Sequence, residues 1–182
     1  KAYHILVEGD GSLVRGNSSI ASNARPLARD YARHTASANT GAIGVSLCCM
    51  AGVNFERDYK NSSAPLTEAQ WEAAIKVMAD LAEHYDILVT PTTILTHAEV
   101  EPNLNRPQSG KWDITRVSFD SRLKGARAVG DELRARVASL LDDGPMTTDD
   151  DMPEDLKPPR YRVSGVHPSH LNFRRSPGGE KV

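Results

Sequence analysis

Cysteine is scarce in this chain of 182 residues: the two cysteines, Cys48 and Cys49, are adjacent. Neighbouring side chains on a strand point to opposite faces, so we expect no disulfide between them, and a disulfide-built scaffold is excluded. A charge excess is also absent, because 22 Lys and Arg stand against 24 Asp and Glu, for a net charge of −2. Nucleic-acid binders normally carry a basic excess, so we expect no nucleic-acid partner. No apolar run approaches the ~20 residues that a membrane span needs.

The composition is that of a folded protein, with 39% hydrophobic and 25% charged residues. Apolar periodicity and turn signals predict regular segments separated by long irregular stretches over 17–40, 51–65 and 97–117. The regular segments are a hairpin over 3–16, a central strand buried on both faces over 42–50, a helix from the capping box Thr67–Gln70 to about 85, a strand over 87–96 and a helix over 120–141. This order predicts an α/β domain.

The composition changes after residue 141. Residues 142–160 hold seven acidic and two basic residues together with four prolines, which is typical of an extended acidic linker. Residues 161–182 hold four basic residues and one acidic residue. We therefore expect a domain over 1–141, a linker over 142–160 and the start of another module over 161–182. Because the chain starts at Lys1 with a strand pattern and no Met, we also expect it to be part of a longer protein.

His97 is the most informative histidine, because it follows the end of the expected strand over 87–96, where α/β folds build sites. Asp113 follows sixteen residues later, and imidazole and carboxylate both suit zinc. Lys111 would point to the same side as Asp113 on an extended segment, where its ammonium could stabilise an oxyanion. A surface histidine and an ion-paired aspartate would explain the same two residues without a metal.

Five blocks of this sequence resemble, in the same order, those of a known family. The blocks are YHILV with GDG over 3–11, RHTA through NTGAIGVSL over 33–47, the helix start over 65–70, THAEV over 96–100 and GKWD over 110–113. They are similar to the zinc amidases that cleave peptidoglycan, the N-acetylmuramoyl-L-alanine amidases of the type-2 amidase and peptidoglycan-recognition superfamily, which includes phage endolysins.

The resemblance implies a mixed central sheet flanked by helices, with Zn²⁺ at one end. It implies hydrolysis of the amide bond between N-acetylmuramic acid and L-alanine. His97 and Asp113 would be zinc ligands, Lys111 would stabilise the tetrahedral intermediate, and Tyr3 would be the catalytic tyrosine. The residues expected to contact the substrate are His4, His34 and Trp112.

The sequence departs from the family pattern at two places that matter. The family's first zinc ligand lies on a strand that would precede Lys1, so we expect the catalytic domain to lack its N-terminal strand and helix and the third ligand to lie upstream. Ser46 stands where many relatives have a catalytic glutamate, so we expect catalysis to depend more on Tyr3. A peptidoglycan-binding module without activity is the alternative, since some members of the superfamily have lost zinc ligands.

The C-terminal segment carries a second resemblance. Tyr161 to Val163 and the LNFRRSPGG run over 171–179 are similar to the opening of bacterial SH3-type domains, which often bind cell walls. The resemblance implies action on the bacterial cell wall, either as an endolysin released into the periplasm or as a secreted protein.

Overall fold

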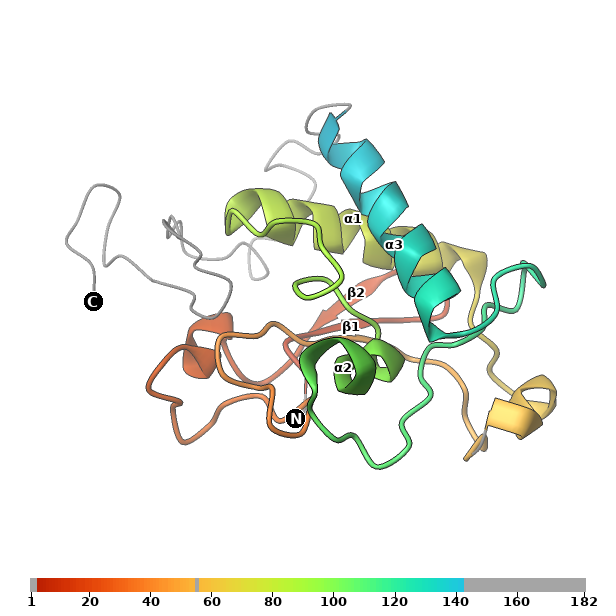
Figure 1. Cartoon of the computed structure of the whole chain (residues 1–182), viewed down its shortest axis with the longest axis horizontal. Helices are drawn as coiled ribbons and strands as arrows, with labels where there is room; N and C mark the ends of the chain where they lie inside the picture. The colour runs from red at the N-terminus through yellow and green to blue at the C-terminus, as the bar shows by residue number, and fades with distance from the viewer. Residues whose placement is uncertain (1–2, 55, 143–182) are drawn as a thin grey trace.

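A computed structural model describes residues 3–54 and 56–142 (Figure 1). Its three strands form one mixed sheet in the order β2-β1-β3. Strand β1 (Ile5–Val7) pairs antiparallel with β2 (Leu13–Arg15) and parallel with β3 (Val45–Leu47). Two short 3-10 helices, η1 (Ile20–Asn23) and η2 (Glu56–Asn61), lie in the long loops on either side of β3. A mixed sheet with helices confirms the predicted fold class and the hairpin.

Strand β3 differs from the central strand predicted over 42–50. It is three residues long, half-buried, and pairs within the described residues with β1 alone, so β1 takes the middle of the sheet. The apolar run leaves the strand after Leu47, and Met50 adopts a left-handed conformation with φ of 62°. Cys49 and Met50 then pack against the helical core. The prediction was wrong because a continuous apolar run fits core packing as well as a buried strand.

Helix α1 (Glu68–His84) begins and ends as predicted. Thr67 and Gln70 form the capping box: Thr67 Oγ1 accepts from Gln70 N, and Gln70 Oε1 accepts from Thr67 N. The fully buried Gln70 also donates from Nε2 to the carbonyl oxygens of Val7 and Cys48, at 3.0 and 3.2 Å. The helix start is therefore bonded to the ends of β1 and β3, and its apolar side covers the sheet.

The segment 87–96 is not the predicted strand. Residues 91–93 form a turn, in which Thr90 N donates to Thr93 Oγ1 at 3.0 Å and Ile94 N donates to Thr90 O at 3.1 Å. Threonine side chains compete for backbone groups, and Pro91 has no N–H to give to a sheet. Helix α2 (His97–Leu104) follows directly, inside the stretch predicted to be irregular.

Helix α3 (Ala126–Asp142) confirms the predicted second long helix but begins six residues later than the pattern suggested. Asp120 accepts a hydrogen bond from Arg122 N at 2.9 Å, which makes a local turn, and Gly125 adopts a φ of 95°. Helices α1 and α3 cross in Figure 1, and their buried side chains make one core. That core includes Trp71 and Ile75 from α1 and Val129, Leu133 and Val137 from α3. Among the described helices, none is long and apolar enough to cross a membrane.

Candidate active site

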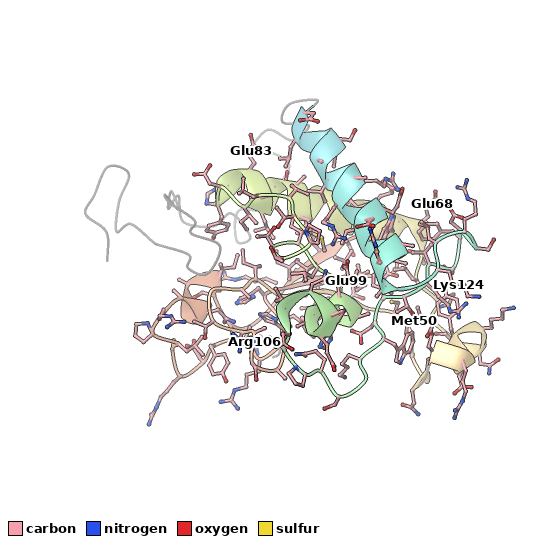
Figure 2. All side chains as sticks on the ribbon, in the orientation of Figure 1. Met50, Glu68, Glu83, Glu99, Arg106 and Lys124 are labelled. Carbon is pink, nitrogen blue, oxygen red and sulfur yellow. The ribbon has the colours of Figure 1, made fainter. Side chains whose placement is uncertain are left out.

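The start of helix α2 carries His97, and a buried ion pair holds it in place. Glu99 accepts from Thr96 N at 3.0 Å and from Arg134 of α3 at 2.9 and 3.2 Å. Arg134 also donates to Ile94 O at 2.9 Å. Figure 2 shows Glu99 between α2 and α3, and both charged side chains are buried. Arg134 bonds to Glu99 in the first turn of α2 and to Ile94 in the loop before it. Because of these bonds, α3 fixes the direction in which α2 starts.

His97 and Asp113 meet across the loop that follows α2. His97 Nδ1 lies 3.1 Å from Asp113 Oδ2, and Ala98 N donates to Asp113 O at 2.8 Å, so the backbone also joins the two segments. The hydrogen bond to Asp113 raises the pKa of His97. The other ring nitrogen, Nε2, lies 3.0 Å from Gln108 Oε1. The structure therefore brings together the two residues predicted to share a metal.

Tyr3 and His34 adjoin this pair. Their rings stack with centroids 6.2 Å apart. Burial raises the pKa of Tyr3, and the negative charge of Asp113 adds to the effect. Burial lowers the pKa of His34, and the charge of His97 also lowers it. Both side chains therefore lie within electrostatic reach of the His97–Asp113 pair. Gly44 is needed behind His34, because a Cβ there would lie 2.5 Å from the imidazole ring.

His4 lies beneath this group and is bonded within the chain through both ring nitrogens. Its Nδ1 accepts from Gly44 N at 2.9 Å, so Nε2 carries the hydrogen that faces Asn23 Oδ1 at 3.1 Å. Burial lowers the pKa of His4 to about 4, so the ring is neutral at neutral pH. Asn23 in turn donates to the carbonyl oxygens of Ala32 and Asn39. His4 is therefore placed to shape the loop that carries His34, and its two nitrogens are not open to a substrate.

Lys111 and Trp112 precede Asp113 on the same loop. Lys111 is exposed, and its charge is one of the smaller influences on His97, where it lowers the pKa. Trp112 is partly exposed and donates from Nε1 to Asn54 O at 3.3 Å. Both residues predicted from the GKWD block thus lie on the segment that leads into Asp113.

Several residues of this region were not singled out from the sequence. Gln108 contacts His97, Asn23 contacts His4, and the pair Glu99–Arg134 anchors α2. The spacing Thr96-x-x-Glu99 was an available signal for the helix start, since it is the same one that marks α1. Cys49 is also close: burial raises its pKa to about 11, with a contribution from Asp113, so its thiol stays protonated. Both cysteines are free and only partly buried.

The distance between the ligand atoms of His97 and Asp113 can be compared with that in a zinc site. Zinc binds imidazole nitrogen and carboxylate oxygen at about 2.0–2.2 Å in a tetrahedral arrangement, so two such ligands lie roughly 3.3 Å apart. The observed 3.1 Å between Nδ1 and Oδ2 fits this distance. Within residues 3–54 and 56–142, no three His, Cys, Asp or Glu side chains are grouped so that they could hold a metal ion. The donors therefore fit two of the three protein ligands of a catalytic zinc site.

Comparison with known proteins gives the class of this fold and site. The chain matches the Amidase_2 family, described as N-acetylmuramoyl-L-alanine amidase, over residues 1–114. The matched region contains all seven candidate site residues predicted from the sequence, from Tyr3 to Asp113. No curated protein and no solved structure gave a significant match. The chain belongs to the N-acetylmuramoyl-L-alanine amidase family, whose substrate is peptidoglycan.

Proposed function

We propose that this chain hydrolyses the amide bond between N-acetylmuramic acid and L-alanine in peptidoglycan in a zinc-dependent reaction. The observation that carries the proposal is the 3.1 Å approach of His97 Nδ1 to Asp113 Oδ2 in a member of this amidase family. Without a cation or a proton between them, two acceptor atoms would not be stable so close together. The pair is thus suited to share a divalent metal.

His97 and Asp113 would hold the Zn²⁺, and a third ligand would come from outside the described residues. When bound, zinc polarises a carbonyl and lowers the pKa of its water to about 7. Asp113 is half exposed, so substrate and solvent can reach this edge of the site. His97 is held from behind by its second nitrogen, which leaves Nδ1 directed at the open side.

Tyr3 and Lys111 supply the remaining polar groups. The raised pKa of Tyr3 keeps its hydroxyl protonated at neutral pH, so Tyr3 can donate a hydrogen bond or a proton to the reacting amide. The Lys111 ammonium is a flexible cation on an exposed loop, where it can approach the oxygen that becomes negative when the carbonyl is attacked. His34 and Trp112 flank these groups and would contact the glycan or the peptide.

We further propose that the catalytic domain spans residues 1–141 and that the remainder tethers it to its substrate. Asp142, the first residue of the proposed acidic linker over 142–160, is the last residue of α3. The rest of the linker and the SH3-like segment over 161–182 lie outside the described residues. The composition of the linker and the LNFRRSPGG run support this organisation. It suits an endolysin or a secreted amidase, in which a wall-binding segment raises the local concentration of substrate.

Digestion of purified peptidoglycan tests the proposal, with the release of new L-alanine amino groups as the measurement. The chain should be expressed with any natural N-terminal extension. We expect His97→Ala to lower the rate at least 100-fold, and a chelator to abolish activity that added Zn²⁺ restores. His84→Ala is the matched control, because it removes a histidine at the end of α1, outside the site. Full activity of His97→Ala, or activity that resists chelation, would contradict the zinc mechanism.

A peptidoglycan-binding module without activity is the second candidate, and one observation favours it. The described residues group two zinc-type ligands rather than three. Muropeptide binding by the wild-type protein, with no bound zinc and no release of amino groups, would support binding over hydrolysis. Zinc at one equivalent per chain together with amine release would exclude it.

A further inference from the structure

Gln108 is a buried glutamine whose side-chain orientation is fixed by the chain around it. It is 4% exposed. Its Nε2 donates to Ala36 O at 2.9 Å and to Arg106 O at 3.0 Å. Carbonyl oxygens accept and cannot donate, so the nitrogen of the amide must lie on their side and Oε1 on the other. The two carbonyls therefore determine which atom of Gln108 faces the site.

That atom is Oε1, and it faces His97. The distance from Gln108 Oε1 to His97 Nε2 is 3.0 Å. Because an amide oxygen can only accept, Nε2 must carry a hydrogen. Nδ1 is then the nitrogen that faces Asp113 Oδ2 at 3.1 Å, and a shared metal ion or, in the metal-free protein, a proton has to lie between these two atoms.

The backbone of Gln108 is anchored independently of its side chain. Gln108 N donates to Glu101 Oε2, on α2, at 2.9 Å. The bond to Ala36 O joins Gln108 to the loop that follows His34, 72 positions earlier in the sequence. Three segments therefore hold Gln108: α2 bonds its backbone N–H, and the loop after α2 and the loop that carries His34 bond its side-chain Nε2. The side-chain oxygen is directed at one ring nitrogen of His97.

We propose that Gln108 is a positioning residue that sets the tautomer and ring orientation of His97, so that Nδ1 is the nitrogen available to a metal. The proposal deepens the zinc-dependent function proposed above and rests on it for its purpose. Metal-binding histidines commonly donate their second N–H to an acceptor, and losing that acceptor typically costs 10–100-fold in metal affinity. Here an amide oxygen takes the role of that acceptor, oriented by the carbonyls of Ala36 and Arg106.

Two variants separate positioning from folding. Gln108→Met keeps a long side chain of similar volume but removes the acceptor, which frees His97 to adopt either tautomer. Glu101→Gln weakens the anchor of the Gln108 backbone but leaves the amide and its two carbonyl partners unchanged. If Gln108 served only to tie the loops together, both variants should have similar effects.

The deciding measurement is the ¹⁵N NMR spectrum of the His97 ring at alkaline pH in the metal-free Asp113→Ala protein, which lacks the competing acceptor at Nδ1. Long-range ¹H–¹⁵N correlations identify the protonated nitrogen. Loss of the signals in His97→Asn assigns the ring. In this background we expect the Nε2–H tautomer with Gln108 present and also with Glu101→Gln, and a tautomer mixture or the Nδ1–H form with Gln108→Met. An Nδ1–H ring in Asp113→Ala alone, or an unchanged tautomer when Gln108→Met is added, would overturn the proposal.

Metal affinity gives the second readout. Zn²⁺ titration should show a 10–100-fold weaker affinity for Gln108→Met than for Glu101→Gln or the wild type. Equal affinities would contradict the positioning role. If Gln108 controls the tautomer in the Asp113→Ala background but the wild-type protein binds no zinc, the result would count against the proposed function, while the control of the tautomer by Gln108 would stand.

Discussion

At the residue scale, buried polar side chains that bond within the chain support the candidate site residues. Asn23 is almost fully buried and contacts His4 and the loop around Ala32 and Asn39. Gln108 does the same for His97. Such groups are costly to bury unless each donor and acceptor has a partner, and here the partners lie on distant segments. The site is therefore rigid where His97 is held and open where Asp113 is exposed.

The Glu99–Arg134 pair gives a prediction at this scale. Arg134→Ala leaves the buried Glu99 carboxylate without its main partner, and breaking such a pair typically costs about 3–5 kcal/mol. We expect a decrease of this order in the free energy of unfolding, measured in urea. Arg127→Ala on the same helix is the control, since its pair with Asp131 is exposed and worth at most about 1 kcal/mol. Similar losses in the two variants would contradict the assigned role.

At the scale of elements, the long helices were predictable and the short ones were not. Helix α1 was found from an apolar stripe and its capping box, both of which are local signals. Helix α2 carries the same Thr-x-x-Glu/Gln spacing, but it buries only Glu99 and Val100 and contains Pro102, so no apolar stripe marks it. Its stability comes from Arg134, 35 residues away from Glu99, and no local pattern encodes that contact.

In the candidate site, too, the residues marked by local motifs were predictable and the contacts between distant segments were not. The motif blocks identified His97 and Asp113, and the structure brings them together. The supports of His97 could not be read from the sequence, because Gln108 reaches Ala36 across 72 positions. A glutamine in a polar loop looks solvated until the fold shows what surrounds it. The sequence therefore identified the candidate site residues better than the residues that hold them in place.

The approach of α3 to α2 gives a second prediction. Replacing glycine with alanine inside a helix normally stabilises it by about 0.5–1 kcal/mol. Gly130 is an exception, because a Cβ there would lie 2.1 Å from the carboxylate oxygens of Glu99. We expect Gly130→Ala to lower the free energy of unfolding by about 1–3 kcal/mol, in urea titration, since Glu99 cannot move without breaking its bonds to Arg134.

Gly9→Ala is the matched control for that variant. No heavy atom lies within 4 Å of a Cβ built at Gly9, which is in the exposed turn between β1 and β2. We expect a change within about 0.5 kcal/mol. A Gly130→Ala protein at least as stable as the wild type would contradict the close packing of α3 against Glu99 of α2.

At the scale of the whole molecule, the site joins segments that are far apart in the chain. Tyr3 precedes β1, His34 lies in the loop between η1 and β3, and His97 and Asp113 come after α1. The site therefore exists only where these distant segments have folded together. Two of the histidines that hold the segments together, His4 and His34, are buried with lowered pKa values, so the native state favours their neutral forms. Global stability should consequently depend on pH.

His4 provides the sharpest form of that pH dependence. Its pKa is about 4 in the folded chain against an ordinary value of 6.5, so its contribution is fully present above pH 6.5. Between pH 6.5 and about 4, the His4 imidazole is protonated in the unfolded chain but stays neutral in the folded chain. The free energy of unfolding then falls by about 1.4 kcal/mol per pH unit, roughly 3 kcal/mol in all. His97 has the opposite effect on the pH dependence of stability, because its pKa is raised.

His4→Asn isolates the effect of His4, since an asparagine oxygen can still accept from Gly44 N. Urea unfolding from pH 7.5 to 4 should give a shallower loss of stability for His4→Asn than for the wild type, and parallel curves would show that His4 does not control the acid limit of the fold.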